Sequence, residues 1–212
     1  MAKDKTEATE KRTRMRGEER RESILVHAKK VFAQYGYLDA STGELARASE
    51  VTEPMLYKHF GNKRGLFAEV MKQCSASFMQ VWEQQVEQRA ERDILDALRH
   101  VLMDYDAAIS ADPDTQKVLF HAVTQAGSDS HIASGLRKHN QRVQKTIHGL
   151  LVQAEAQGKL APGIDLDAAG WGYISMFFAM QYSIVLDLRN DLNPTMLEKI
   201  NQLWFCAVTG GA

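Results

Sequence analysis

The sequence predicts an all-α protein, and three observations support that prediction. Only four of the 212 residues are proline. Apolar side chains recur every three or four positions, which is the period of an amphipathic helix, while alternating strand patterns are almost absent. Gly, Pro and Asn residues separate these segments at regular intervals. With 44% hydrophobic and 25% charged residues, the composition is that of a globular protein able to bury a sizeable core.

The first helix is predicted over residues 18–35. Ile24, Ala28 and Val31 recur at helical spacing within it, and Gly36 supplies a left-handed stop. The preceding segment is polar and rich in charge. We therefore expect residues 1–17 to form a disordered, basic and charged arm.

Two short helices are predicted next. Ser41 and Glu44 have the spacing of a capping box, which opens a helix that ends near Ser49. Thr52 is the expected N-cap of the second short helix. Pro54 falls in its first turn, where a missing N–H costs little.

Six longer helices complete the prediction. Asn62 is the expected cap of the first, and Gly or Pro residues mark most of the later boundaries. We expect these helices over residues 63–89, 93–110, 113–126, 129–157, 165–190 and 195–208. The most apolar run, residues 171–186, is shorter than the roughly 20 residues that span a membrane, so we interpret it as a buried helix.

Charge is distributed unevenly along the chain. Residues 1–66 hold 14 Lys and Arg against 10 Asp and Glu, whereas the remainder holds 12 against 17. A basic head on an acidic body indicates that the head binds a polyanion. The cysteines, Cys74 and Cys206, lie far apart in sequence, and the charged N-terminus does not read as a signal peptide. We therefore expect a reduced, cytoplasmic protein with no membrane contact.

Residues 41–60 have the pattern of a helix-turn-helix, whose second helix enters the major groove of DNA. Its small core is expected to consist of Leu45, Ala46, Val51, Leu56 and Phe60. The outward positions of the second helix mix hydrogen-bonding, apolar and cationic side chains, as a surface that meets bases and phosphates requires. They are Thr52, Glu53, Pro54, Met55, Tyr57, Lys58 and His59.

The chemistry of these side chains suggests roles on DNA. Tyr57 and His59 can donate to phosphate oxygens, and Lys63 adds a positive charge at the start of the next helix. Lys58 can reach a guanine edge or a phosphate. Glu53 can accept from cytosine N4, and its apolar neighbours can pack on a thymine methyl.

The stretch from Arg21 to Val70 resembles the DNA-binding domain of TetR-type bacterial transcriptional regulators. The strongest match is Leu56-Tyr57-Lys58-His59-Phe60 followed by Asn62-Lys63 and Leu66. Spacing agrees over the whole stretch, which is more specific than a generic helix-turn-helix. The resemblance implies that Thr42, Tyr57, His59 and Lys63 touch the DNA backbone. It implies that Glu53, Pro54, Met55 and Lys58 face bases.

Two positions depart from the family pattern. The turn commonly reads Ala-Gly-Val in the family, whereas here it reads Ser49-Glu50-Val51. Glu50 lacks glycine's freedom at positive φ, so we expect a strained or differently shaped turn. Gly43 removes a side chain that some relatives use as an extra contact.

The resemblance also implies a homodimeric regulator, expected to be a repressor, that binds a palindromic double-stranded operator and is released by a small effector. In this interpretation residues 18–66 bind DNA through the helix-turn-helix, and residues 67–212 bind the effector and dimerise. The pocket candidates, which suit a hydrophobic effector, are Tyr105, Phe120, His121, Trp171, Phe178 and Gln181. The dimer candidates, on the last two predicted helices, are Tyr173, Phe177, Met180, Ile200, Leu203 and Trp204.

Catalytic patterns are missing from the sequence. The histidines form no metal-binding pair, and His131 and His139 are interpreted as solvated. No Gly-rich phosphate loop or nucleophile elbow occurs. We expect no enzyme activity, no cofactor and no metal. Two alternatives stay open: a helical ligand-binding module without specific DNA binding, and an enzyme built within the helical body.

Overall fold

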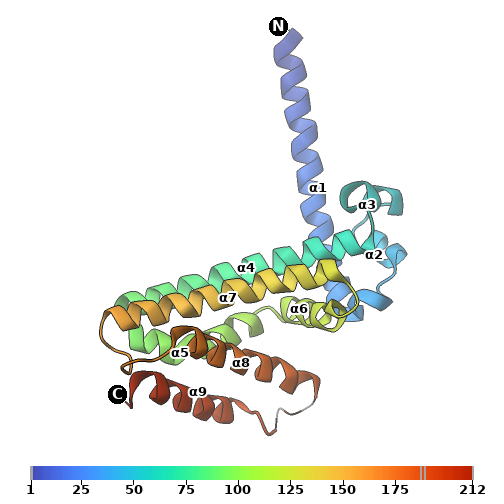
Figure 1. Ribbon diagram of the computed structural model, residues 1–212. Coiled ribbons are helices and arrows are strands. Elements are labelled where there is room, and N and C mark those ends of the chain that lie inside the picture. Colours follow the sequence, from blue (N-terminus) through green and yellow to red (C-terminus); the bar gives the residue numbers. More distant parts are fainter. Residues whose placement is uncertain (1, 187, 189, 212) are drawn as a thin grey trace. The chain divides into compact units, whose positions relative to one another are not determined.

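The computed structural model describes residues 2–186, 188 and 190–211, and these residues form helices joined by short turns (Figure 1). The predicted all-α fold is confirmed. In chain order the helices are α1 (Ala2–Asp39), α2 (Thr42–Ala48), α3 (Glu53–Phe60), α4 (Lys63–Arg92), α5 (Ile94–Ser110), α6 (Pro113–Ala126), α7 (Ser130–Ala156), α8 (Leu166–Val185) and α9 (Pro194–Thr209).

Capping residues explain why most helix ends lie close to their predicted positions. The side chains of Asp93, Asp165 and Asn193 each accept a hydrogen bond from a backbone N–H two or three residues further on. The end of α8 is different: the helix stops at Val185, before residue 190. Apolar residues continue past this point, so hydrophobicity alone does not mark the boundary.

α1 begins at Ala2, within the segment expected to form a disordered arm, and that expectation stays a prediction. Lys, Arg, Glu and Ala dominate this segment and are strong helix formers. Glu7 and Lys11, like Glu10 and Arg14, also have the i,i+4 spacing that favours a helix.

Gly36 interrupts α1 where the sequence predicts its stop. Its backbone adopts φ 75° and ψ −177°, which is not helical, and only Tyr37–Asp39 continue the helix beyond it. Glycine is suited to this conformation because it has no Cβ to clash at positive φ. The kink redirects the chain toward α2.

The helices form two compact units. Unit 1 comprises Met1–Ser75 and Pro113–Leu136, and unit 2 comprises Ala76–Asp112 and Arg137–Ala212. This division falls inside α4 and α7 and groups α6 with the N-terminal helices. It does not coincide with the boundary expected after residue 66. The assignment of DNA binding and effector binding to separate linear domains stays a prediction.

Buried aromatic and aliphatic side chains hold unit 1 together. Phe32 of α1 and Phe67 of α4 meet edge to face, with ring centroids 4.9 Å apart. Both rings are fully buried, as are Leu45 of α2 and Leu56 of α3, and Phe60 is nearly so. The predicted core of the helix-turn-helix is therefore confirmed for Leu45, Ala46, Leu56 and Phe60, whereas Val51 in the turn is only half-buried.

α6 packs along α1 within unit 1. Its side chains Val118 and Ala122 are fully buried. His121 lies against the kink of α1, since a Cβ added to Gly36 would come within 3.0 Å of its Nδ1. Periodicity reveals the apolar side of a helix but not the helix it packs against, which is why α6 was not assigned to the N-terminal unit from sequence.

Unit 2 has an aromatic core. Trp82 of α4, Tyr105 of α5 and Phe177 of α8 contact one another edge to face, with centroid distances between 4.4 and 6.3 Å. The backbone N–H of Leu102 donates to the hydroxyl of buried Tyr173 at 2.6 Å. The buried hydroxyl of Tyr173 is thus hydrogen-bonded, as stable packing of a buried polar group requires.

Candidate nucleic-acid interface

α2 begins with a complete capping box. The N–H of Glu44 donates to Ser41 Oγ at 3.1 Å, and the N–H of Ser41 donates to the Glu44 carboxylate at 3.0 Å. Hydrogen bonds from the side chain and the backbone of Ser41 lower the pKa of Glu44, because they favour its ionised form. The predicted start of the helix-turn-helix is confirmed.

The turn between α2 and α3 contains Glu50 at φ 53°. Among the residues that the structure describes, it is the one non-glycine residue with positive φ. The N–H groups of Glu50 and Val51 bond back to the carbonyls of Arg47 and Ala46, at 3.1 and 3.0 Å. The turn is therefore closed with Glu50 in the left-handed region, at the expense of backbone strain on the order of 1–3 kcal/mol.

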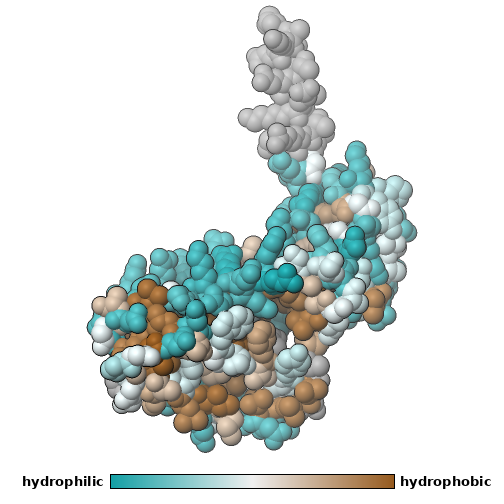
Figure 2. All heavy atoms as spheres, viewed as in Figure 1, coloured by the Kyte–Doolittle hydropathy of each residue, from teal (hydrophilic) through white to brown (hydrophobic). Residues whose placement is uncertain are grey.

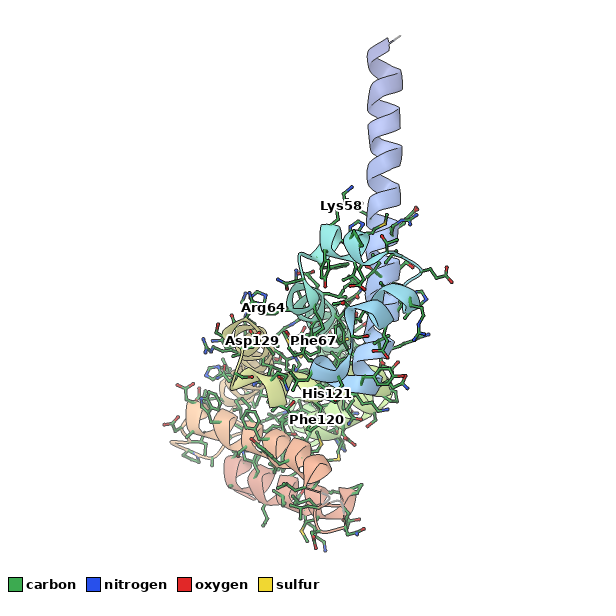
Figure 3. The ribbon with its side chains drawn as sticks, turned by 90° about the vertical axis from the view of Figure 1, so that its right-hand side faces the viewer. Lys58, Arg64, Phe67, Phe120, His121 and Asp129 are labelled. Carbon is green, nitrogen blue, oxygen red and sulfur yellow. The ribbon has the colours of Figure 1, made fainter. Side chains whose placement is uncertain are left out.

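α3 presents a polar face to solvent and an apolar face to the domain. Thr52 occupies the N-cap position in extended conformation, although its side chain makes no capping hydrogen bond. Pro54 lies in the first turn, as predicted. The expected outward side chains are exposed or half-buried; Lys58 projects away from the helices around it, whereas Phe67 lies among them (Figure 3).

Thr42 and Glu53 contact each other across the turn. The Thr42 hydroxyl donates to the Glu53 carboxylate at 2.9 Å, which ties the first turn of α2 to the first turn of α3. A Cβ on the intervening Gly43 would lie 3.6 Å from Glu53 Oε1, in ordinary contact. The two residues expected to meet the DNA backbone and a base are thus already joined without DNA.

Lys63 is held by the protein itself. Its ammonium donates to the carbonyl oxygens of Leu38 and Ala40, at 3.0 and 3.1 Å, and lies 5.0 Å from the ring centroid of Tyr37. An ammonium group has three N–H donors, so one remains for a phosphate. The sequence predicted the charge of Lys63 but not this bond to the end of α1.

Sequence reasoning missed Arg20, which lies beside α3. Its Nη1 is 4.0 Å from the sulfur of Met55, one of the expected base-facing residues. Its neighbour Arg21 points elsewhere: it bonds Glu69 at 2.7 Å and lies 5.1 Å from the Phe60 ring centroid. That bond lowers the pKa of Glu69. Arg20 and Arg21 make different contacts because they point in different directions from α1. Local sequence does not indicate the rotation of α1 that sets these directions.

Comparisons with known proteins agree with this geometry. Residues 24–70 match the family model described as bacterial regulatory proteins of the tetR family. The chain is 29% identical to the transcriptional repressor ComR of Escherichia coli over 78% of this chain and 80% of ComR. It is also 29% identical to the repressor BepR of Brucella suis, over 71% and 73%.

Residues 24–70 therefore carry a DNA-binding domain of the TetR type. A solved structure of a TetR-family regulator from Mesorhizobium loti superposes with a TM-score of 0.75 at 17% identity, covering 91% of this chain and 96% of that one. At this identity the likeness shows the fold. The resemblance identified from Arg21–Val70 is thereby confirmed.

The predicted effector-pocket residues do not gather in one place. Phe120 and His121 belong to unit 1, whereas Tyr105, Trp171 and Phe178 belong to unit 2. Tyr105 is buried in the aromatic core, but Trp171 is 57% exposed and Phe178 is 40% exposed. The side chain of Gln181 lies outside the described part of the structure.

The dimer candidates also divide into two groups. Tyr173, Phe177 and Met180 are at most 5% exposed and lie in the core of unit 2, so they are corrected from interface to core. Leu203 is 73% exposed, while Ile200 and Trp204 are partly exposed. α8 is apolar on nearly every side, and hydrophobic periodicity therefore cannot say which side faces inward.

Large apolar side chains remain on the outside of α8 and α9. Figure 2 shows hydrophobic residues gathered along the lower part of the molecule, where Figure 1 places these two helices. The residues exposed there are Trp171, Phe178, Tyr182, Met196 and Leu203. A contiguous apolar surface of this kind marks an interaction site more often than a solvated one.

One buried polar pair in unit 2 was not anticipated. The hydroxyl of Tyr105 lies 3.3 Å from Nε2 of His139, and both side chains are buried beside Phe78. Burial lowers the pKa of His139 to about 4, so its ring is neutral at pH 7. The interpretation of His139 as solvated is wrong, whereas His131 is exposed.

A polar depression lies between α4 and α5 of unit 2. It has a volume of about 280 Å³, and Arg89 at its wall bonds Asp96 and Asp104 at 2.9 Å each. The described residues contain no cluster of three potential metal ligands and no helix long and apolar enough to cross a membrane.

Proposed function

We propose that this TetR-type regulator is a ligand-responsive repressor that binds an operator through α2 and α3. The observation that carries the proposal is the exposed polar face of α3, which is held on a buried Leu45–Leu56–Phe60 core and follows α2, the helix that begins with a capping box. Within this face Lys58 and Glu53 read base edges, while Tyr57 and His59 hold the phosphates. Such a regulator works in the cytoplasm, where its DNA is.

The regulator acts as a homodimer, because one α3 helix reads only a half-site. Regulators of this family bind operators as dimers. The exposed apolar side chains of α8 and α9, among them Trp171 and Leu203, support this assignment, because a twofold dimer buries the same surface of both copies. Two recognition helices then meet one side of the duplex about 34–36 Å apart, which requires a palindromic operator.

A small hydrophobic or amphipathic effector binds unit 2 and releases the DNA. The neutral Tyr105–His139 pair among aromatic rings supports this assignment, because ligand sites combine apolar walls with a few oriented polar groups. Release requires that the effector binds the conformation with wrongly spaced α3 helices more tightly than the DNA-bound one.

Selection of bound sequences from random DNA by the purified protein tests the operator proposal. The expected product is a palindrome whose half-site centres lie one helical turn, or a multiple of it, apart. Recovery of no preferred sequence, together with binding of small hydrophobic molecules, would instead identify a helical ligand-binding module.

A further inference from the structure

Glu53 brings a negative charge to the face of α3 that is proposed to meet DNA. Its side chain is exposed at the first residue of the helix. A carboxylate repels phosphates, so Glu53 adds nothing to the sequence-independent attraction between protein and DNA. An ionised carboxylate only accepts hydrogen bonds, and the base groups that donate in the major groove are the amino groups of cytosine and adenine. Glu53 therefore suits base recognition rather than general affinity.

The Thr42 hydroxyl holds this carboxylate in place. It donates to Glu53 Oε2 at 2.9 Å. Both residues lie in the first turn of a helix, and each helix is fixed on the core of unit 1 by a fully buried leucine, Leu45 of α2 and Leu56 of α3. The bond restricts the glutamate side chain before DNA arrives, which reduces the rotamer freedom that is lost when the side chain binds a base.

The bond to Glu53 also uses the one proton that Thr42 can donate. A threonine hydroxyl has a single O–H donor, and a phosphate oxygen accepts hydrogen bonds. While Thr42 donates to Glu53, its hydroxyl cannot also donate to a phosphate. The backbone contact that the family resemblance implies for Thr42 therefore competes with this bond.

Gly43 leaves space beside the second carboxylate oxygen. A Cβ at this position would already lie 3.6 Å from Glu53 Oε1, so a longer side chain would begin in contact with that oxygen. A carboxylate has lone pairs on both oxygens. Oε1 can therefore accept a further hydrogen bond while Oε2 is held by Thr42.

We propose that Thr42 is a positioning residue for base recognition, which holds Glu53 so that Oε1 accepts from N4 of a cytosine at one position of each half-site. This proposal rests on the proposed function, because it places the DNA on the outward face of α3. Cytosine is favoured over adenine, since the N7 acceptor beside the adenine amino group repels a carboxylate. Thr42 itself contacts neither the base nor a phosphate in this arrangement.

Two substitutions of Thr42 form a matched pair that tests the positioning role. Thr42→Val removes the hydroxyl and keeps the branched shape, whereas Thr42→Ser keeps the hydroxyl. Bound sequences are selected from random DNA with the parent chain, with both variants and with Glu53→Ala. Affinities are then measured for duplexes that differ from the selected operator at single base pairs, and melting temperatures check that each variant is folded.

Thr42→Val and Glu53→Ala should lower the preference for cytosine at the same position of each half-site, by about fivefold or more. Preferences at the other positions should stay, and Thr42→Ser should keep the preference of the parent chain. In the Glu53→Ala background, Thr42→Val should have no further effect on this preference, because the side chain that Thr42 positions is gone.

An equal loss of affinity for all sequences in Thr42→Val would overturn the proposal, because that is the result expected of a phosphate contact. An unchanged preference for cytosine in Thr42→Val would overturn it as well. Both results leave operator selection by α3 intact. A parent chain that selects no sequence instead refutes the proposed function, and the positioning role with it.

Discussion

Two lysines near the surface proposed to face DNA differ in the contacts that their side chains make. Lys58 is exposed on α3, whereas the Lys63 ammonium donates to two backbone carbonyls at the end of α1. The sequence suggests DNA contact for both. Only the bonds of Lys63 show that it also holds α4 against the end of α1.

Lys58→Ala should therefore weaken DNA binding, whereas Lys63→Ala should also lower the stability of the fold. Lys63→Ala should lower the free energy of unfolding by about 1–3 kcal/mol, because it leaves part-buried carbonyls without a charged donor. Lys58→Ala should leave stability within about 0.5 kcal/mol and weaken binding by about 1–3 kcal/mol at particular base pairs. Denaturant unfolding and binding to single-base operator variants measure the two effects. A stable Lys63→Ala protein would contradict the assignment.

Buried His139 makes stability depend on pH. Its pKa is lowered to about 4 in the folded chain, chiefly by burial, and lies near 6.5 when unfolded. Between these values only the unfolded state binds the proton. Stability is therefore full above about pH 6.5 and falls toward pH 4, by at most about 1.4 kcal/mol per pH unit.

The free energy of unfolding, measured from pH 7.5 to 4.5 for the parent chain and for His139→Gln, checks this expectation. The difference between the two proteins isolates His139 from the carboxylates that titrate in the same range. A difference that does not change with pH would contradict the shifted pKa.

At the scale of the element, the kink of α1 depends on a close approach by α6. Gly36 has φ 75°, and a Cβ there would lie 3.0 Å from His121 Nδ1. Burial lowers the pKa of His121, which favours the neutral ring at this contact. The end of α1, from which the chain turns into α2, is thus shaped by a helix more than seventy residues further along the sequence.

Gly36→Ala should destabilise unit 1 by about 1–3 kcal/mol, through both the positive φ and the contact with His121. Adding His121→Ala should recover only the part due to crowding, because the backbone strain remains. A double-mutant cycle on unfolding free energies separates the two terms. Strict additivity of the two substitutions would exclude the contact as a source of strain.

At the scale of the whole molecule, an exposed apolar surface on α8 and α9 supports the proposed homodimer. Leu203 is 73% exposed and Trp171 is 57% exposed, although both are large and apolar. Tyr173 and Phe177 on the same α8 are buried. One side of α8 thus packs in the core, and the other is the side that the proposed homodimer would bury.

Leu203→Glu should raise the dimer dissociation constant at least about tenfold, because it places a charge in a desolvated interface. Operator affinity should fall with it, since the two half-sites are then bound separately. Val152→Glu on α7 is a suitable control, because Val152 is also exposed. Sedimentation velocity measures the assembly, and an unchanged dimer in Leu203→Glu would contradict this interface.

Local sequence patterns predict most of the helices, their caps and the helix-turn-helix. Capping boxes, glycine stops and hydrophobic periods act between residues a few positions apart, so Ser41–Glu44 and the stop at Gly36 are readable without a fold. The family resemblance of Arg21–Val70 rests on the same local spacing.

The side of each helix that packs against another helix cannot be predicted from local sequence and is visible in the tertiary structure. Several features depend on elements that are distant in sequence. Among them are the burial of Tyr173, the exposure of Trp171, the packing of α6 on α1 and the approach of Arg20 to Met55. An apolar side of a helix indicates only that some other part of the protein must cover it. What covers it depends on the rotation and position of every helix around it.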